Sequence, residues 1–212
     1  RRGERLARCR GSMRNQHEVL LINPWIYDFA AYNLWIEPLG LLTLAAILSA
    51  RGFSVTVVDC LAPDGDSPAA APDGSGKLRK TILDSPEAVS FVPRRYGRYG
   101  LPREQFDTAL RQAPRPDLVF VSSGMTYWYP GVMAVTSRLR AFFGSVPIAL
   151  GGVYATLCPD HARRHSGADQ VIVGPGIPAA LRYAERITGA PVGGGNLSDP
   201  KAWPAPAHEL VP

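Results

Sequence analysis

The feature that most constrains the fold is a series of short, almost wholly apolar stretches that alternate with helix-like segments. The clearest case is residues 18–59. Here residues 19–23 and 54–59 are near-continuous runs of Val, Leu and Ile, and between them lies a predicted helix that Pro38 opens and Gly52 ends. Apolar runs without polar alternation predict strands that are buried on both faces, as in a parallel sheet covered by helices. Residues 18–59 therefore predict one βαβ unit.

The same unit recurs through the rest of the chain. Further apolar strands are predicted at residues 117–124, 146–152 and 169–174. Helices are predicted at residues 103–112, 132–143 and 159–165, and from Pro178 to a stop at Gly189. Five buried strands separated by helices predict an open, doubly wound α/β sheet of five parallel strands. Two common strand orders satisfy the rule that crossover connections are right-handed, namely that of a Rossmann half and the flavodoxin-like order 2-1-3-4-5. With five strands, we expect the flavodoxin-like order.

The charge of the chain is concentrated at its start. The formal net charge is +5, and residues 1–14 hold six arginines against Glu4, which leaves 17 basic and 17 acidic residues in the remainder. An electrically neutral folded part does not favour specific nucleic-acid binding. We interpret residues 1–16 as a disordered basic leader and Met13 as the natural start.

Two other segments differ in composition from the predicted core. Residues 61–102 begin with a stretch rich in Pro, Gly, Asp and Ala and contain the repeat RYGRYG, which we interpret as part of a surface insertion. Residues 190–212 are rich in Pro and Gly and predict an extended tail or linker toward a further domain. The α/β domain itself is predicted to span residues 17–189.

Several functional classes receive no support from the sequence. No stretch of about 18 uninterrupted apolar residues is present and no secretory signal is recognised, so we expect a cytoplasmic protein without a membrane partner. Cys9, Cys60 and Cys158 are too widely spaced for a disulfide framework or a zinc signature. His161 and His165 lie four residues apart, but arginines flank them and no HExxH is present. We predict a solvated helix face there and no metal site.

Ligands of open α/β sheets bind beyond the carboxyl ends of the strands, where the strand order reverses. This rule selects the loops at residues 24–37 and 125–130, which hold three of the four tryptophans and four of the eight tyrosines. Such a concentration of aromatic rings suits a large, flat, partly apolar ligand or a protein interface. The alternative is that the rings cap the end of the sheet as core. The aromatic residues are Trp25, Tyr27, Phe29, Tyr32, Trp35, Tyr127, Trp128 and Tyr129.

The later strands end in small residues, which allow a ligand to approach the backbone closely. They are Ser122, Ser123, Gly124, Gly151, Gly152, Gly174 and Gly176. No GxGxxG or GxxxxGK[ST] is present, which disfavours a dinucleotide or P-loop site. Asp28 and Asp59 are candidate hydrogen-bonding carboxylates, but they form no acid-base pair, so we assign no catalytic residue.

These motifs in combination resemble the N-terminal cobalamin-binding-type domain of class B radical SAM enzymes. The resemblance covers residues 18–188 and rests on the first βαβ unit, on DLVFVSSG, on VPIALGGVYATLCPD and on GADQVIVGPG. It implies a B12-binding Rossmann-like fold that presents a corrinoid to a radical SAM domain. The implied cofactor-binding residues are Asn23, Pro24, Trp25, Tyr27, Asp28, Asp59, Ser122, Ser123, Gly124, Tyr127, Gly151, Gly152, Tyr154 and Gly174.

The chain departs from the family pattern in two ways. The DxHxxG motif, whose His binds cobalt in many cobalamin domains, is absent, so the resemblance implies cobalamin without a protein His as lower ligand. The CxxxCxxC of the iron-sulfur cluster is also absent. The chain therefore looks like a fragment, with the cluster and SAM confined to a missing domain, and we expect no activity from it alone.

Two other functions compete with this interpretation. One is a stand-alone α/β interaction module that has lost cobalamin and docks a partner protein through its aromatic loops. The other is an enzyme of the sugar-nucleotide type whose glycine loops bind phosphate, although no paired general acid and base supports it.

Overall fold

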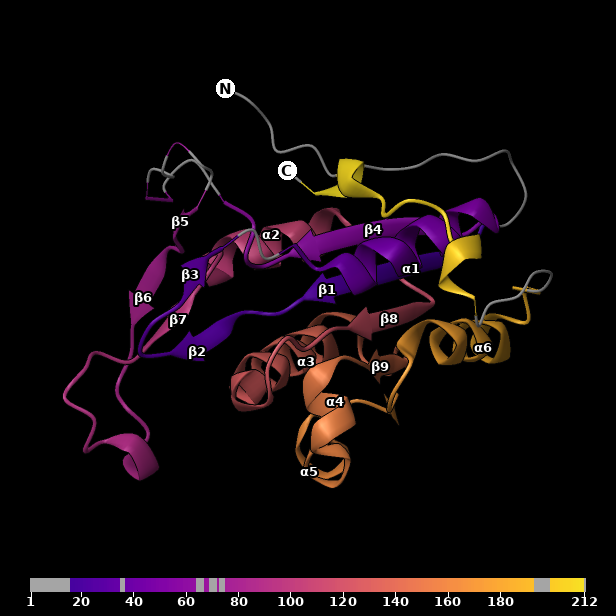
Figure 1. The fold of residues 1–212 in the computed structure, drawn as a ribbon. Coiled ribbons are helices and arrows are strands. Elements are labelled where there is room, and N and C mark those ends of the chain that lie inside the picture. The colour runs from indigo at the N-terminus through magenta and orange to yellow at the C-terminus, as the bar shows by residue number, and fades with distance from the viewer. Residues whose placement is uncertain are drawn as a thin grey trace.

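The computed structural model describes residues 16–34, 37–63, 67–68, 72, 75–192 and 199–211. Its centre is a five-stranded parallel sheet in the order β10-β9-β8-β1-β4 (Figure 1). Counted along the chain this order is 2-1-3-4-5, which confirms the predicted fold class. The strands are β1 (Glu18–Asn23), β4 (Ser54–Asp59), β8 (Leu118–Val121), β9 (Ile148–Leu150) and β10 (Gln170–Val171).

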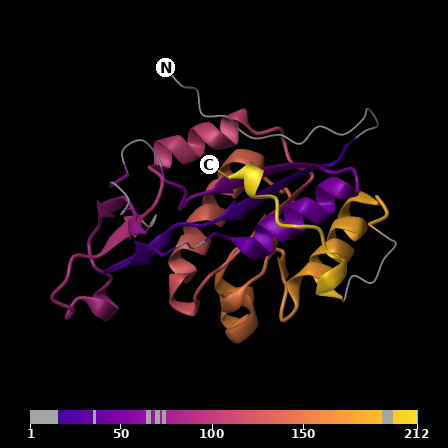
Figure 2. The ribbon, with the colours of Figure 1, turned by 45° about the horizontal axis from the view of Figure 1, so that its top comes forward.

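Helices cover both faces of this sheet. On one face α1 (Leu39–Ala50) and α6 (Gly176–Thr188) lie side by side (Figure 2). The other face carries α2 (Arg103–Gln112), α3 (Tyr129–Phe143), α4 (Val153–Leu157) and α5 (Pro159–His165), whose buried residues join a second core. Alternate residues of β1 supply the two cores: Leu21 packs with α1 and α6, whereas Leu20 packs with α2 and α3. This two-sided burial explains why the strand sequences are apolar throughout.

Three strands are shorter in the structure than the sequence predicts. The sequence predicts that the third, fourth and fifth strands end at Gly124, Gly152 and Gly174, but in the structure they end at Val121, Leu150 and Val171. The residues beyond leave the sheet and form the turns into the following helices. Two helices begin earlier than the sequence predicts: α3 begins at Tyr129 and not at Val132, and α6 begins at Gly176 and not at Pro178. Proline is tolerated within the first helical turn, so Pro130 and Pro178 lie inside these helices.

Part of the predicted insertion at residues 61–102 is a structured extension of the carboxyl edge of the sheet. There β2 (Ile26–Asp28) continues the path of β1 and pairs with β7 (Gly97–Tyr99), which pairs with β6 (Lys80–Ile82) (Figure 1). The repeat RYGRYG is predicted to be part of a surface insertion, but only its first residue, Arg95, is exposed, and residues 96–100 are all buried. Arg98 lies over the Trp25 ring, with 5.3 Å from its guanidinium carbon to the ring centroid. The smaller elements are β3 (Tyr32–Asn33), β5 (Gly76–Lys77) and η1 (Glu87–Val89).

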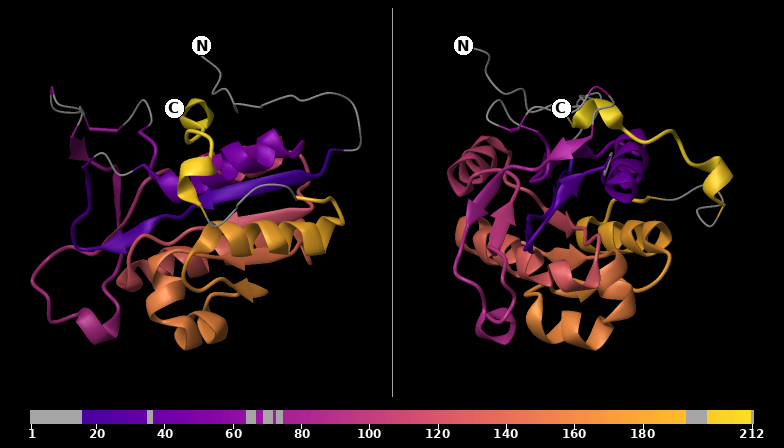
Figure 3. Two further views of the ribbon diagram at one scale, coloured as in Figure 1. Left: turned by 45° about the vertical axis from the view of Figure 1, so that its right-hand side comes forward. Right: turned by 60° about the vertical axis from the view of Figure 1, so that its left-hand side comes forward.

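The tail predicted as an extended linker packs on the domain. Its described residues include η3 (Pro200–Ala202) and η4 (His208–Leu210), and the segment lies against α1 (Figure 3). The Ala207 N–H donates to the Leu42 carbonyl at 3.1 Å, and Leu210 is buried in the core of α1 and α6. We call residues 199–211 the C-terminal strap. The predicted leader, apart from residue 16, and Trp35 lie outside the described residues.

Candidate functional site

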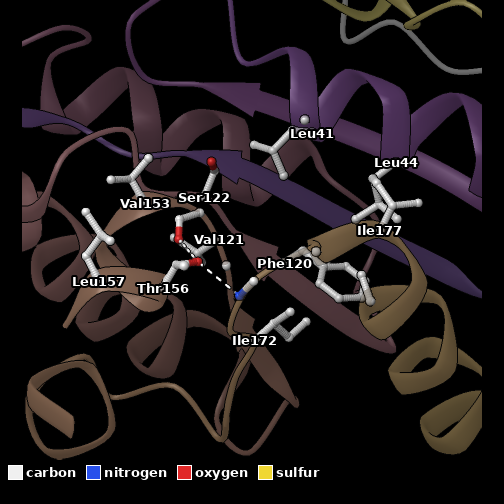
Figure 4. A pocket seen from close by; sticks show the side chains of 16 residues that line it. Leu41, Leu44, Phe120, Val121, Ser122, Val153, Thr156, Leu157, Ile172 and Ile177 are labelled. Atoms are coloured by element: carbon white, nitrogen blue, oxygen red, sulfur yellow. Dashed lines mark hydrogen bonds between the residues drawn. The ribbon is translucent and has the colours of Figure 1, made fainter. Parts of the chain in front are cut away.

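A candidate site is a cavity of about 500 Å³ at the carboxyl ends of β8, β9 and β10 (Figure 4). It lies between α1 and α6 on one side and the start of α4 on the other. We call it the apolar cavity, because its walls are mainly apolar and include Leu41, Leu44, Phe120, Ile172 and Ile177. Ligand sites of proteins measure roughly 300–1,000 Å³ and have this mainly apolar lining, so both size and chemistry suit an organic ligand.

Glycines form the rim of the apolar cavity where the strands end. Gly151, Gly152, Gly174 and Gly176 all line it. Gly152 has φ 94° and ψ −165°, a backbone conformation that is almost restricted to glycine. A Cβ there would lie 2.4 Å from the carbonyl oxygen of Ser123. Only glycine therefore allows the start of α4 to pack this closely against the end of β8.

Ser123 joins the end of β8 to the start of α4 through hydrogen bonds. Its carbonyl accepts a hydrogen bond from the Val153 N–H at 2.8 Å, and its hydroxyl donates to the Gly151 carbonyl at 3.0 Å. The same hydroxyl oxygen accepts the Tyr154 N–H at 3.1 Å. Ser123 is thus buried and fully engaged, so it shapes the site without offering a free group to a ligand.

Polar groups at the mouth come from Thr156 and Ser122. The Thr156 hydroxyl donates to the Gly152 carbonyl at 2.9 Å and accepts the Gly174 N–H at 3.2 Å, and so links the loops after β9 and β10 (Figure 4). The Ser122 hydroxyl has no hydrogen-bond partner within the described part of the chain. It lines both the apolar cavity and a neighbouring smaller one, and is therefore free to bind a ligand.

The smaller cavity, about 100 Å³, lies at the reversal of strand order between β1 and β8. It is lined by Asn23, Pro24, Trp25, Glu37, Ser122, Ser123 and Gly124, among others. The Asn23 amide donates to the Asp59 carboxylate at 2.7 Å, and the Leu61 N–H donates to the same oxygen at 2.8 Å. Burial raises the pKa of Asp59 above its ordinary value, these hydrogen bonds oppose the rise, and the charge of Glu37 adds to it.

The predicted aromatic residues divide into core and surface groups. Trp25 is 1% exposed, packs on Phe106 with 4.6 Å between ring centroids, and donates its indole N–H to the Leu101 carbonyl. Tyr154 is also fully buried, and its hydroxyl lies 2.7 Å from Nδ1 of His161. Tyr127 is 53% exposed, so its ring is accessible to a ligand or partner.

Tyr27 and Asp28 lie farther out, on β2. The Tyr27 ring packs against the core under α2 and α3, and its buried hydroxyl has no partner within the described residues. Asp28 accepts the indole N–H of Trp128 at 3.2 Å. Of the rings in the two predicted loops, Trp25 thus lies in the core, as the core-capping alternative expects, whereas Tyr127 is exposed to solvent, where a ligand or a protein partner could contact it.

The sequence prediction missed the walls of the apolar cavity. Leu41, Leu44, Ile177 and Ala180 stand on α1 and α6, whereas the prediction considered only loops at the strand ends. The signal was present in α1, which has no charged residue on any face. It also missed His208, which the C-terminal strap places 2.5 Å from the Glu37 carboxylate.

The described residues offer neither a metal centre of three or more side chains nor a membrane-spanning helix. No group of three or more His, Cys, Asp or Glu is arranged to hold a metal ion there. Among the same residues, no helix is long and apolar enough to cross a membrane.

The fold and the cavity together define a doubly wound α/β domain with an apolar ligand cavity at the carboxyl edge of its sheet. No protein-family model matches the chain, and no curated protein matches it in sequence. Among solved structures, it is similar to a chain of the methanol:cobalamin methyltransferase complex MtaBC from Methanosarcina barkeri, with a TM-score of 0.47 and 15% sequence identity. The match covers 88% of this chain and 51% of the other, so this chain spans about half the length of that neighbour.

Proposed function

We propose that this chain is a cobalamin-binding domain that presents a corrinoid to a radical SAM catalytic barrel outside the chain. The observation that carries the proposal is the apolar cavity, which opens among Ser122, Gly151, Gly152 and Gly174. These are the strand-end positions at which the sequence motifs of the cobalamin-binding type converge.

The residues present fit the nucleotide tail of cobalamin. An aromatic base needs apolar walls, which Leu41, Leu44 and Ile177 supply, and a phosphate and ribose need donors near the mouth. The Ser122 hydroxyl is available for that purpose. The corrin ring would cover the carboxyl ends of the strands, with the exposed ring of Tyr127 in its neighbourhood. When bound, the corrinoid supplies cobalt-centred group-transfer or radical chemistry, whereas the protein supplies binding and orientation.

We further propose that no histidine binds the lower face of cobalt. The loop at residues 24–37 contains no His. His17 lies at the amino end of β1, where its Nδ1 is 3.4 Å from the Asp117 carboxylate. His161 is hydrogen-bonded through its Nδ1 to the Tyr154 hydroxyl. His208 needs a separate test, because the strap brings it to the end of that loop, where it pairs with Glu37.

Absorption spectroscopy of bound hydroxocobalamin tests the lower ligand. The spectrum should be unchanged in the variant in which all four histidines become Ala, and in His208→Ala alone. A spectral change in either variant would assign a histidine to cobalt and overturn this part of the proposal, while leaving cobalamin binding itself intact.

Cobalamin binding is tested by titrating the full chain with hydroxocobalamin. Gly151 lines the apolar cavity, and a Cβ added there has no atom within 4 Å, so a phenylalanine side chain has room to occupy the space that a ligand would take. Gly151→Phe should therefore abolish binding. Ala141→Phe adds the same ring on the exposed face of α3 and serves as the matched control. Equal affinity of both variants, or no binding by the unaltered chain at micromolar concentration, would refute the proposal.

A second candidate function is an interaction module that has lost cobalamin. It is favoured by exposed apolar side chains near the same edge of the sheet, which are Leu39, Tyr127, Val153 and Leu157. If hydroxocobalamin does not bind, this function takes precedence. The radical SAM parent is tested separately, by reading the gene beyond residue 212 for a CxxxCxxC motif.

A further inference from the structure

A cluster of histidine and tyrosine side chains lies on α4 and α5, outside the apolar cavity. His161 and His165 are one helical turn apart on α5, and their ring centroids are 4.4 Å apart with 41° between the ring planes. Residues four apart on a helix share a face, and a His pair at this spacing is a recurrent zinc-binding arrangement. Metal–nitrogen bonds are about 2.0–2.1 Å long, so two imidazole rings must be neighbours to share an ion, and these two rings are neighbours.

The ring of His161 is held in a fixed orientation. Its Nδ1 lies 2.7 Å from the hydroxyl of the buried Tyr154, and the ring of Tyr129 packs edge-on against it at 4.8 Å between centroids. Nε2 is therefore the nitrogen left to bind a ligand. Metal-binding histidines almost always donate the other ring N–H to a neighbouring acceptor, which fixes the tautomer. The Tyr154 hydroxyl oxygen stands where that acceptor is needed.

The flanking arginines, which argued against a metal site in the sequence, are engaged elsewhere. Arg163 pairs with Asp160 at 2.7 Å, and Arg164 donates to the Asp160 backbone carbonyl at 3.2 Å. His165 is exposed and His161 is half-buried, so an ion has access from solvent. The predicted solvated helix face describes His165 but not His161.

We propose that His161 and His165 form a binding site for a divalent late transition-metal ion of the Cu²⁺, Ni²⁺ or Zn²⁺ class. Tyr154 is the positioning residue: in the bound form His161 Nδ1–H donates to its hydroxyl oxygen. Imidazole suits these ions, whereas Mg²⁺ and Ca²⁺ require oxygen ligands that the pair does not offer. Two protein ligands leave further coordination positions to water. The site is independent of cobalamin binding.

The test is calorimetric titration of the full chain with CuCl₂, ZnCl₂ and MgCl₂ in separate experiments. One Cu²⁺ per chain should bind more tightly than Zn²⁺, and Mg²⁺ should not bind. His165→Ala should abolish the binding, and this exposed change should leave the metal-free melting temperature unaltered. His17→Ala and His208→Ala are the matched controls and should bind as the unaltered chain does.

The role of Tyr154 is tested by Tyr154→Phe, which keeps the buried ring. Loss of such a partner typically lowers metal affinity by about 10–100-fold. Affinity equal to that of the unaltered chain would overturn the positioning role. Copper binding that survives His165→Ala, or that is lost in Cys9→Ser or Cys158→Ser instead, would overturn the site itself, as would the absence of Cu²⁺ binding.

Discussion

Replacement of Gly152 by Ala is the sharpest test of how the rim of the apolar cavity is built. The backbone at Gly152 has φ 94° and ψ −165°, and a non-glycine residue held in this region costs about 1–3 kcal/mol. The added Cβ would also lie 2.4 Å from the carbonyl oxygen and 2.8 Å from the backbone nitrogen of Ser123. Because Ser123 carries the hydrogen bonds that join β8 to α4, relief of this overlap requires the junction to move.

We expect a total loss of about 3 kcal/mol, taken at the upper end of that range because the overlap adds to the backbone strain. For a domain of this size each kcal/mol lowers the melting temperature by about 2–4 °C, so the expected fall is about 6–12 °C. Thermal unfolding followed by circular dichroism measures it.

Gly151→Ala is the matched control for this experiment. Gly151 is the preceding residue, its φ is not positive, and a Cβ there meets no atom within 4 Å. Its melting temperature should therefore change by no more than about 2 °C, since a substitution without new contacts stays within about 0.5 kcal/mol. Equal melting temperatures for the two variants would refute the reasoning.

Three further predictions concern stability. Deleting residues 1–12 should leave the melting temperature within error, since the apolar pattern begins at Val19, and a fall of several degrees would contradict this. The pKa of Asp59 is raised in the folded protein, so its contribution to stability is fully present below the ordinary pKa of 3.8 and is lost as the pH rises through the folded-state pKa. Asp59→Asn should therefore weaken the dependence of the unfolding free energy on pH, which denaturant titrations at several pH values measure. An unchanged pH dependence would refute this prediction. Leu210→Ala should cost about 2 kcal/mol, at the lower end for a buried Leu. The exposed Glu209→Ala should cost little, and equal losses would show that the strap does not stabilise the core.

The local signals in the sequence were sufficient for the sheet and for several helices. The bounds of α2 and α5 agree with the predicted ranges, because proline precedes or opens each helix and the residues that follow favour helix. The strand order followed from right-handed crossovers and the number of strands. The apolar cavity was not predictable in this way, because its walls depend on how α1 and α6 pack against each other, which is a long-range property.

The burial of the RYGRYG repeat escaped prediction for the same reason. Its Arg98 is buried only because β7 pairs with β2, a strand some seventy residues earlier in the chain that continues β1. Neither strand is longer than three residues, so neither has a recognisable periodicity. Charged and aromatic residues in a glycine-rich context then resemble a surface loop, although here they form the wall that extends the carboxyl edge.

The composition of α1 explains why the C-terminal strap lies where it does. The helix LGLLTLAAILSA has no charged residue, and a helix with so little polar surface is favoured where several of its sides are covered. The sheet covers one side, and α6 lies beside it. The strap packs Ala207 and Leu210 into the same core, with the Ala207 N–H bonded to the Leu42 carbonyl. Because Leu41 and Leu44 of this helix also line the apolar cavity, the strap helps to hold the wall against which a ligand would bind.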